Sequence, residues 1–293
     1  MPDQTALPPL LDVLDLRVAY PSREGGMTEV VRGVSFTLGR ERLGIVGESG
    51  SGKSQTGRAI LGLTAPGGVV SAQTLRLGAG AGGIDLLTCP PKQRRTLRGG
   101  RIAMVLQDPK FSLDPVMRIG AQIEETLQAH APVPARERRE RVLQALADVG
   151  IDNPARLAAL YPHEVSGGMG QRAMIAMMLI AGPELLIADE PTSALDVTVQ
   201  LQVLAILDRL VREGRDGRGM GLIFVSHDLR LVSSFCDRVL VMYAGRVVEE
   251  IAATELQRAQ HPYTRGLLNC LPQLGAPQHP LPVLDRQPAW MNG

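Results

Sequence analysis

Apolar and polar residues alternate over two segments near the start of the chain. Between residues 14 and 20, apolar residues alternate with Asp15, Arg17 and Ala19, and a second strand-like pattern runs from 30 to 38 after a glycine-rich turn. Alternation with a period of two is typical of strands that bury one face. The two segments therefore predict an antiparallel layer at the start of the fold.

Three short apolar runs have a different, continuous pattern. They span residues 42–46, 185–188 and 221–225. Continuous runs of this length are typical of parallel strands that are buried on both faces. The first run is followed by a glycine-rich turn and then by residues 55–63, which can form a helix. Strand, turn and helix recurring in this way predict an α/β core.

The segment from 136 to 149 has the period of a helix. Its apolar residues fall on one stripe, and its charged residues lie elsewhere. The stripe consists of Val142, Leu143, Leu146 and Val149. A proline-rich stretch at 131–134 predicts a loop in front of this helix.

We expect this helix to belong to a helical subdomain, residues 108–179, that is inserted into the α/β core. The core then consists of residues 1–107 together with residues 180–255. Residues 256–293 are expected to form a C-terminal extension.

Composition limits the partners that the chain can have. Its 31 Lys and Arg residues stand against 30 Asp and Glu residues, for a formal net charge of +1, so we expect no nucleic-acid partner. The most apolar region, 173–188, is interrupted by Gly182, Pro183 and Glu184, and its unbroken part is shorter than the roughly 20 residues of a membrane-spanning helix. No targeting segment is visible at the N-terminus, and we expect that another subunit crosses any membrane at which the protein works.

A phosphate-binding motif follows the first apolar run. Residues 47–54 read Gly-Glu-Ser-Gly-Ser-Gly-Lys-Ser and fit the pattern G-x-x-x-x-G-K-[ST] at every position, between a strand and a helix. Glycines let backbone N–H groups turn toward phosphate oxygens, and the helix N-terminus adds its positive dipole end. Lys53 is expected to reach the β- and γ-phosphates, and the Ser54 hydroxyl to bind Mg²⁺. The predicted nucleotide contacts are Gly47, Glu48, Ser49, Gly50, Ser51, Gly52, Lys53, Ser54 and Gln55.

A second glycine-rich run, residues 78–83, formally contains the pattern G-x-G-x-x-G. That pattern marks a dinucleotide site only when a strand precedes it and a long helix follows it. Here a short apolar stretch and two prolines follow, so we expect a hairpin loop.

Two carboxylates end the apolar run at 185–188. Asp189 and Glu190 follow the run directly, and an acid at the carboxyl end of a parallel strand faces the crevice where ligands bind. Asp189 can hold Mg²⁺, and Glu190 can act as the general base that polarises an attacking water. The pair predicts that the nucleotide is hydrolysed as well as bound.

Four further motifs discriminate between families of nucleotide hydrolases. Residues 166–168 read Ser-Gly-Gly and precede Asp189 by the length of a short helix, and residues 193–196 read Ser-Ala-Leu-Asp. Gln107 follows a strand pattern, and His227 stands in the sequence Val-Ser-His-Asp. Each motif is weak alone, so their order along the chain carries the argument.

Together with the phosphate-binding motif and the two carboxylates, these motifs follow one another along the chain in the same order as in a known protein family. From about Val13 to Leu268 the chain resembles the ATP-binding subunits of ABC transporters. The resemblance implies an α/β fold, namely a P-loop ATPase core with an antiparallel β layer and an inserted α-helical subdomain. It also implies that the chain hydrolyses ATP with Mg²⁺ as cofactor.

The resemblance assigns roles to single residues. Glu190, His227, Gln107 and Lys53 are the implied catalytic residues, with His227 at the γ-phosphate and Gln107 at Mg²⁺ or the attacking water. The implied Mg²⁺ ligands are Ser54, Gln107 and Asp189. Tyr20, at the end of the first strand pattern, resembles the aromatic residue that stacks on adenine.

The resemblance further implies that two such subunits pack head to tail and enclose each ATP between them. The nucleotide then lies between the phosphate loop of one subunit and the Ser-Gly-Gly motif of the other. The implied contacts in trans come from Ser166, Gly167, Gly168, Met169 and Asp196.

Four segments resemble the branch that imports dipeptides, oligopeptides and some nickel complexes. They are residues 47–56, 161–164, 188–200 and 261–264. In such importers a solute-binding protein delivers cargo to two membrane-spanning permease subunits, and two ATPases drive them from the cytoplasmic face of the inner or plasma membrane. We therefore expect a peptide importer that includes a sister ATPase or a second copy of this chain, with a nickel or metal-chelate importer as the alternative.

A non-transport ABC ATPase of DNA repair or chromosome organisation is a more distant alternative. Those proteins carry long insertions between the phosphate loop and the Ser-Gly-Gly motif, whereas the gap from Gln107 to Ser166 is short. A GTPase is disfavoured because no Asn-Lys-x-Asp stretch occurs. A small-molecule kinase would not need the hydrolytic Glu190.

Overall fold

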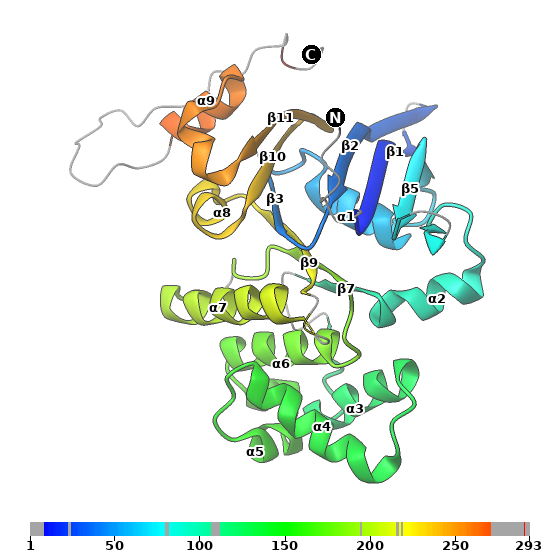
Figure 1. Cartoon of the computed structure of the whole chain (residues 1–293), viewed down its shortest axis with the longest axis vertical. Coiled ribbons are helices and arrows are strands. Elements are labelled where there is room, and N and C mark those ends of the chain that lie inside the picture. The colour runs from blue at the N-terminus through cyan, green and yellow to red at the C-terminus, as the bar shows by residue number, and fades with distance from the viewer. Residues whose placement is uncertain are drawn as a thin grey trace, which may run out of the picture. The chain divides into compact units, whose positions relative to one another are not determined.

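The computed structural model of the chain describes residues 9–22, 25–79, 82–106, 112–193, 195–214, 217, 219–270 and 290 (Figure 1). The chain divides into two compact units. Unit 1 combines residues 1–88 with 224–293, and unit 2 consists of residues 89–223. The expected boundaries of the helical subdomain, residues 108–179, come from the helical pattern of the sequence and not from contacts, and they stay a prediction.

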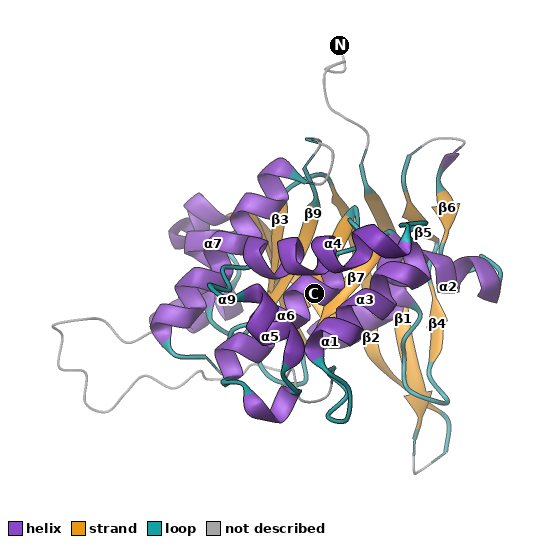
Figure 2. Ribbon diagram, turned by 90° about the horizontal axis from the view of Figure 1, so that it is seen from below, coloured by secondary structure: helices purple, strands orange, loops and turns teal. Residues whose placement is uncertain are grey.

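Unit 1 opens with an antiparallel sheet in the strand order β2-β1-β5-β6, with β4 paired to β1 (Figure 2). The sheet confirms the expected antiparallel layer. Its strands are β1 (Leu11–Pro21), β2 (Met27–Leu38), β4 (Val69–Ser71), β5 (Thr74–Leu77) and β6 (Ile84–Asp85).

A bulge in β1 changes which of its residues point into the core. The pairing with β2 shifts register between Val13 and Leu16, where Asp15 has a φ of 53°. Val13 and Leu16 are both buried, whereas Leu14 is 44% exposed. An extra residue in a strand reverses the inward and outward alternation beyond it. The strand was therefore predicted correctly, but its first apolar position faces outward.

The glycine-rich run at 78–83 joins β5 to β6. These strands pair antiparallel, Arg76 opposite Asp85 and Leu77 opposite Ile84. This pairing confirms the expected hairpin.

The α/β part of unit 1 is built on β3 (Arg42–Val46), which has the bounds of the first apolar run. Strand β10 (Arg238–Tyr243) lies parallel to β3, and β11 (Arg246–Ala252) lies antiparallel to β10. A Cβ atom at Gly44 would lie 2.3 Å from Val232 of α8, so glycine allows that helix to lie close to β3. The helices of this part are α1 (Lys53–Leu61), α8 (Leu229–Phe235), η4 (Ala253–Arg258) and α9 (Pro262–Asn269).

Unit 2 is mainly helical, and β7 (Ile102–Val105) and β8 (Leu185–Asp189) pair in parallel within it. Between these strands the chain runs through the helices drawn in green in Figure 1, which confirms the expected helical insertion. Buried Val142 and Leu146 lie on the predicted apolar stripe. The helices of unit 2 are α2 (Pro91–Gly100), α3 (Ile119–His130), α4 (Ala135–Asp148), α5 (Pro154–Ala159), η3 (Pro162–Glu164), α6 (Gly167–Leu179) and α7 (Val197–Glu213).

Strand β9 (Gly221–Ser226) contains the division between the two units and is buried along its whole length. It begins with the apolar run at 221–225 and extends one residue beyond it. Across the residues that the structure describes, no helix has both the length and the hydropathy for a membrane span.

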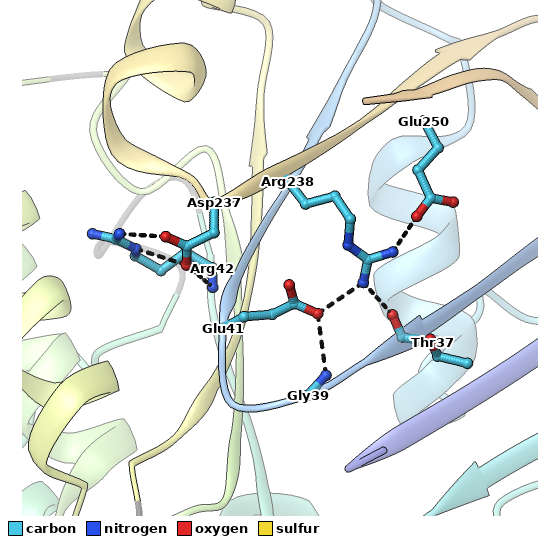
Figure 3. A network of polar contacts seen from close by, with 7 residues as sticks. All are labelled: Thr37, Gly39, Glu41, Arg42, Asp237, Arg238 and Glu250. Carbon is cyan, nitrogen blue, oxygen red and sulfur yellow. Dashed lines mark hydrogen bonds and ion pairs between the residues drawn. The ribbon is translucent and has the colours of Figure 1, made fainter. Parts of the chain in front are cut away.

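Arg238 of β10 forms hydrogen bonds and ion pairs that link β10 to β2 and β11 (Figure 3). Its guanidinium donates to the Thr37 carbonyl at 2.5 Å and to the Glu41 carboxylate at 2.8 Å, and it pairs with Glu250. The Glu41 carboxylate also accepts a hydrogen bond from the Gly39 N–H at 3.2 Å. Burial works against the charge of Arg238, but the hydrogen bonds that it donates to the carboxylates of Glu41 and Glu250 outweigh this effect and raise the pKa of the side chain. The end of β2 is thereby held to β10 and β11.

A second contact in Figure 3 aligns β3 with β10. The Arg42 backbone N–H donates to the Asp237 carboxylate at 2.8 Å, and the Arg42 guanidinium forms an ion pair with it at 2.5 Å. Asp237 directly precedes β10, and Arg42 begins β3. Because the two strands are parallel, fixing their starts also sets the register of their carboxyl ends, where the phosphate-binding motif begins.

Candidate active site

The phosphate loop, residues 47–54, lies between β3 and α1 as expected. Gly47, Gly50 and Gly52 have φ values of 151°, 82° and 100°, a region that side chains disfavour. A Cβ atom at Gly47 would lie 2.1 Å from the Met242 carbonyl oxygen, and one at Gly52 would lie 2.7 Å from the Val30 carbonyl oxygen. Both obstacles are backbone atoms, which cannot rotate away. Glycine is therefore required at these two positions of the loop.

Lys53 is held inside the phosphate loop. Its side chain is 5% exposed, and its Nζ donates to the carbonyls of Gly47 and Glu48, both at 2.8 Å. Ser51 is buried beside it, whereas Ser49 and Gly50 are exposed. A cation enclosed by a loop of glycines at a helix N-terminus is suited to bind an anion. The residues of this loop thus fit a nucleotide phosphate.

The turn between β10 and β11 supports the loop from the side. The Gly245 N–H donates to the Ser51 carbonyl at 3.1 Å, and the Gly245 carbonyl accepts from the Arg32 N–H at 2.7 Å. Ala244 and Gly245 both have positive φ, at 46° and 86°. One tight turn therefore connects the loop to β2 of the antiparallel sheet.

Tyr20 contacts Gln55, the last of the predicted nucleotide-binding residues. Its hydroxyl donates to the Gln55 Oε1 at 2.8 Å and accepts from the Ala65 N–H at 3.3 Å. A Cβ atom at Gly68 would lie 2.7 Å from the Tyr20 ring. The ring is half-buried and held at the site, while its stacking on adenine stays a prediction.

His227 follows β9 and belongs to unit 1, like the phosphate loop. The side chain is exposed, and the backbone around it is ordered by its neighbours. Asp228 caps α8 by accepting from the N–H groups of Arg230 and Leu231, and its own N–H donates to the Ser226 hydroxyl at 3.0 Å. Gln107, another of the implied catalytic residues, lies outside the described residues.

The two carboxylates stand at the end of β8 in unit 2, as expected. Asp189 is 6% exposed. Glu190 has a φ of 50°, and its carbonyl accepts from the hydroxyl of Ser193 at 3.2 Å and from the Ser193 N–H at 3.3 Å. A non-glycine residue in this backbone region is strained, and such strain is concentrated at functional sites. The turn sets the direction in which the Glu190 side chain leaves the strand.

The Ser-Gly-Gly motif forms the start of α6. Ser166 is the N-cap, and its hydroxyl accepts from the Met169 N–H at 3.3 Å. Ser166 and Gly167 are exposed, and a Cβ atom at Gly167 would meet nothing within 4 Å. At Gly168 a Cβ atom would lie 2.8 Å from Val199 of α7. Packing within the chain explains the second glycine but not the first.

Asp196 is the N-cap of α7, where its carboxylate accepts from the N–H groups of Thr198 and Val199, both at 3.0 Å. The structure thus gives this residue a helix-capping function within the chain.

Sequence reasoning missed Gln171, a buried residue of α6 whose side-chain amide donates to the Pro191 carbonyl at 2.7 Å. That contact joins the helix of the Ser-Gly-Gly motif to the turn after Glu190.

Comparisons with known proteins agree with this geometry. Residues 31–193 match the ABC transporter family. The chain is 48% identical over 268 residues to the probable peptide ABC transporter ATP-binding protein y4tR of Sinorhizobium fredii, covering 90% of this chain and 77% of that protein. It is 46% identical over 269 residues to the oligopeptide transport ATP-binding protein OppD of Salmonella typhimurium, with the same two coverages.

A solved structure has the same fold. It is the dimeric, post-hydrolysis state of the ATP-binding cassette MJ0796 bound to ADP and Pi, with a TM-score of 0.70 and 25% sequence identity. The alignment covers 83% of this chain and 98% of that cassette.

Replacing Gly47 with alanine is predicted to weaken ATP binding by roughly 5- to 150-fold. The new Cβ overlaps the Met242 carbonyl oxygen and imposes a disfavoured φ, so the loop must shift, and a strain of about 1–3 kcal/mol corresponds to that loss. Titration with a fluorescent ATP analogue measures the affinity. Gly25→Ala is the control, because it has a φ of 88° but open space around it. Equal affinities for both variants and the wild type would contradict the role of Gly47.

Proposed function

We propose that this chain, which belongs to the ABC transporter family, is the ATP-hydrolysing subunit of an importer for dipeptides or oligopeptides. The observation that carries the proposal is a phosphate loop with an enclosed lysine in a chain 46–48% identical to peptide-transport ATP-binding proteins. ATP hydrolysis is the activity, and the loop residues 47–54 are proposed to hold the phosphates. Tyr20 is proposed to stack on adenine.

Lys53 and the N-terminus of α1 are proposed to stabilise the negative charge of the β- and γ-phosphates. Ser54, Gln107 and Asp189 are proposed to hold Mg²⁺, which supplies positive charge to the phosphate oxygens when it is bound. The Ser54 hydroxyl and the Asp189 carboxylate are oxygen donors, the kind of ligand that Mg²⁺ prefers.

Glu190 is proposed to take a proton from the water that attacks the γ-phosphorus. As the new P–O bond forms, the bond between the γ-phosphorus and the bridging oxygen breaks, and ADP leaves with that oxygen. His227 is proposed to contact the γ-phosphate, and Gln107 the attacking water or Mg²⁺. The strained backbone at Glu190, with a φ of 50°, supports this role because such strain is concentrated at functional sites.

A second subunit is proposed to complete each site. Ser166, Gly167, Gly168 and Met169 would contact ATP in trans, and Asp196 would lie at the interface. The exposed start of α6 supports this, since its N–H groups and positive dipole end suit a γ-phosphate. Val197 and Leu201, one turn apart on α7, are 73% and 62% exposed and supply apolar area for the contact. The related cassette MJ0796 is also a dimer.

The similarity to peptide-transport proteins supports a proposal for the other subunits of the transporter. We propose that the chain acts at the cytoplasmic face of the membrane on two permease subunits, with a sister ATPase or a second copy of itself. A solute-binding protein is an indirect partner. Residues 1–107 and 180–255 are proposed to form the ATP-binding core, residues 108–179 the subdomain with the Ser-Gly-Gly motif, and residues 256–293 the extension.

A peptide-loaded solute-binding protein is expected to stimulate ATP hydrolysis by the complete complex of ATPase and permease subunits. Phosphate release is measured with the binding protein empty, loaded with dipeptides or oligopeptides, or loaded with chelated nickel. Stimulation by the nickel complex alone would overturn the peptide assignment and favour the metal-importing alternative. The ATPase assignment is unaffected by that result.

The variant Glu190→Gln is expected to bind ATP normally and to hydrolyse it roughly 10²–10⁴ times more slowly, the usual contribution of a general base. The amide keeps the size of the side chain but cannot accept the proton. Single-turnover hydrolysis by the assembled complex measures the rate. Glu255→Gln, at an exposed position of η4, is the matched control and should retain the wild-type rate. A Glu190→Gln rate equal to that of the control would refute the assignment of the base.

Gly167→Ala separates a role in trans from packing within the chain. The added methyl group meets open space and a helical backbone, so the free energy of unfolding should stay the same or rise by up to about 1 kcal/mol. Hydrolysis by the assembled complex should nevertheless fall by roughly tenfold or more, because the methyl group obstructs donors to the γ-phosphate. Gly82→Ala, which also meets open space, should change neither quantity. Wild-type hydrolysis by Gly167→Ala would count against the contact in trans.

A further inference from the structure

The C-terminal extension contacts the phosphate loop through one hydroxyl group. Tyr263, in the first turn of α9, is fully buried. Its hydroxyl accepts a hydrogen bond from the backbone N–H of Glu48 at 3.1 Å, although the two residues are 215 positions apart. Both residues belong to unit 1.

The start of α9 is fixed to β11 by a carboxylate. Glu249 accepts from the Gln260 N–H at 2.6 Å and from the His261 N–H at 3.3 Å. His261 then caps the helix, its Nδ1 accepting from the Tyr263 N–H at 3.2 Å, and Pro262 occupies the first turn, where its fixed φ suits a helix start. These contacts determine where the Tyr263 side chain leaves the backbone.

Aromatic packing fixes the direction of the Tyr263 ring. The ring centroid lies 4.5 Å from that of Tyr243 and 5.9 Å from that of Trp290. Tyr243 ends β10, directly after Met242, whose carbonyl faces Gly47. The end of β10 therefore supports two parts of the site. Met242 packs against Gly47, the first residue of the loop, and Tyr243 packs against the Tyr263 ring, whose hydroxyl contacts Glu48.

Glu48 is engaged at both of its backbone polar groups. Its N–H donates to the Tyr263 hydroxyl, and its carbonyl accepts from the Lys53 ammonium at 2.8 Å. If the hydroxyl were absent, the partly buried N–H would lose this partner, and the first peptide units of the loop could rotate. The Lys53 ammonium bonds to the carbonyls of those same units. The position of the cation thus depends on the tyrosine.

We infer that Tyr263 is a positioning residue for nucleotide binding, which holds the phosphate loop in its binding shape before ATP arrives. The inference rests on the proposed function. It assigns to the His-Pro-Tyr-Thr segment at 261–264 a role in the site itself, in addition to packing of the extension. Preorganisation of this kind improves affinity because less ordering remains to be done on binding.

The variant Tyr263→Phe is predicted to bind ATP roughly 2–10 times more weakly, the effect of one hydrogen bond. The ring and its packing are retained, so the change isolates the hydroxyl. Tyr243→Phe removes a hydroxyl from the same aromatic cluster without touching Glu48, and its affinity should equal that of the wild type. Titration of the full-length chain with a fluorescent ATP analogue and Mg²⁺ measures all three. Trp290, the one tryptophan in the sequence, reports through its emission whether the cluster is intact.

Turnover distinguishes positioning from general loss of structure. In the assembled complex, Tyr263→Phe should raise KM for ATP by the same factor and leave kcat within about twofold of the wild type, since a uniform binding effect disappears at saturation. A fall in kcat with unchanged KM would overturn the inference. Amide hydrogen exchange on the wild-type chain gives a test that needs no variant. The Glu48 N–H should be protected, and exchange at the rate of the exposed loop residues would also overturn it.

Failure of the inference can be told apart from failure of the proposed function. If Lys53→Ala loses ATP affinity while Tyr263→Phe binds like the wild type, the inference is wrong and the ATPase assignment stands. If the wild type itself does not bind ATP, the proposed function is wrong.

Discussion

The loop that is proposed to bind phosphate packs against backbone atoms of neighbouring strands. Gly47 faces the Met242 carbonyl, Gly52 faces the Val30 carbonyl, and Gly245 bonds to the loop at Ser51. Backbone atoms cannot adopt other rotamers, so the loop has little choice of conformation once β2, β3 and β10 are in place. The ion pairs of Arg238 and Arg42 hold those strands together at their other ends. The shape of the loop is therefore a consequence of sheet assembly.

Several motif residues also serve local structure. Ser166, Asp196 and Asp228 are N-caps of α6, α7 and α8, and each satisfies backbone N–H groups at a helix start. A cap stabilises a helix whether or not a nucleotide is present. All three residues are exposed at those helix starts. Gly167 differs from them because a Cβ atom there would meet no atom of the described residues within 4 Å.

The bounds of strands were predictable where apolar residues form a continuous run. The bounds of β3 match its apolar run, and β8 and β9 each extend one residue beyond theirs. The register of β1 was not predictable, because the bulge at Asp15 depends on pairing with β2. Helix α1 begins at Lys53 and not at Gln55, since the left-handed Gly52 turns the chain directly into the helix.

The sequence by itself determined the chemistry of this protein. The phosphate-binding pattern, the two carboxylates and each later motif need only a few neighbouring residues, and the order of these motifs is read directly along the sequence. Only the tertiary structure decided which distant residues support them. The contacts of Tyr263 with Glu48 and of Arg238 with Thr37 span 215 and 201 positions. Such contacts depend on the path of the whole chain, and neither periodicity nor motif spacing contains that path.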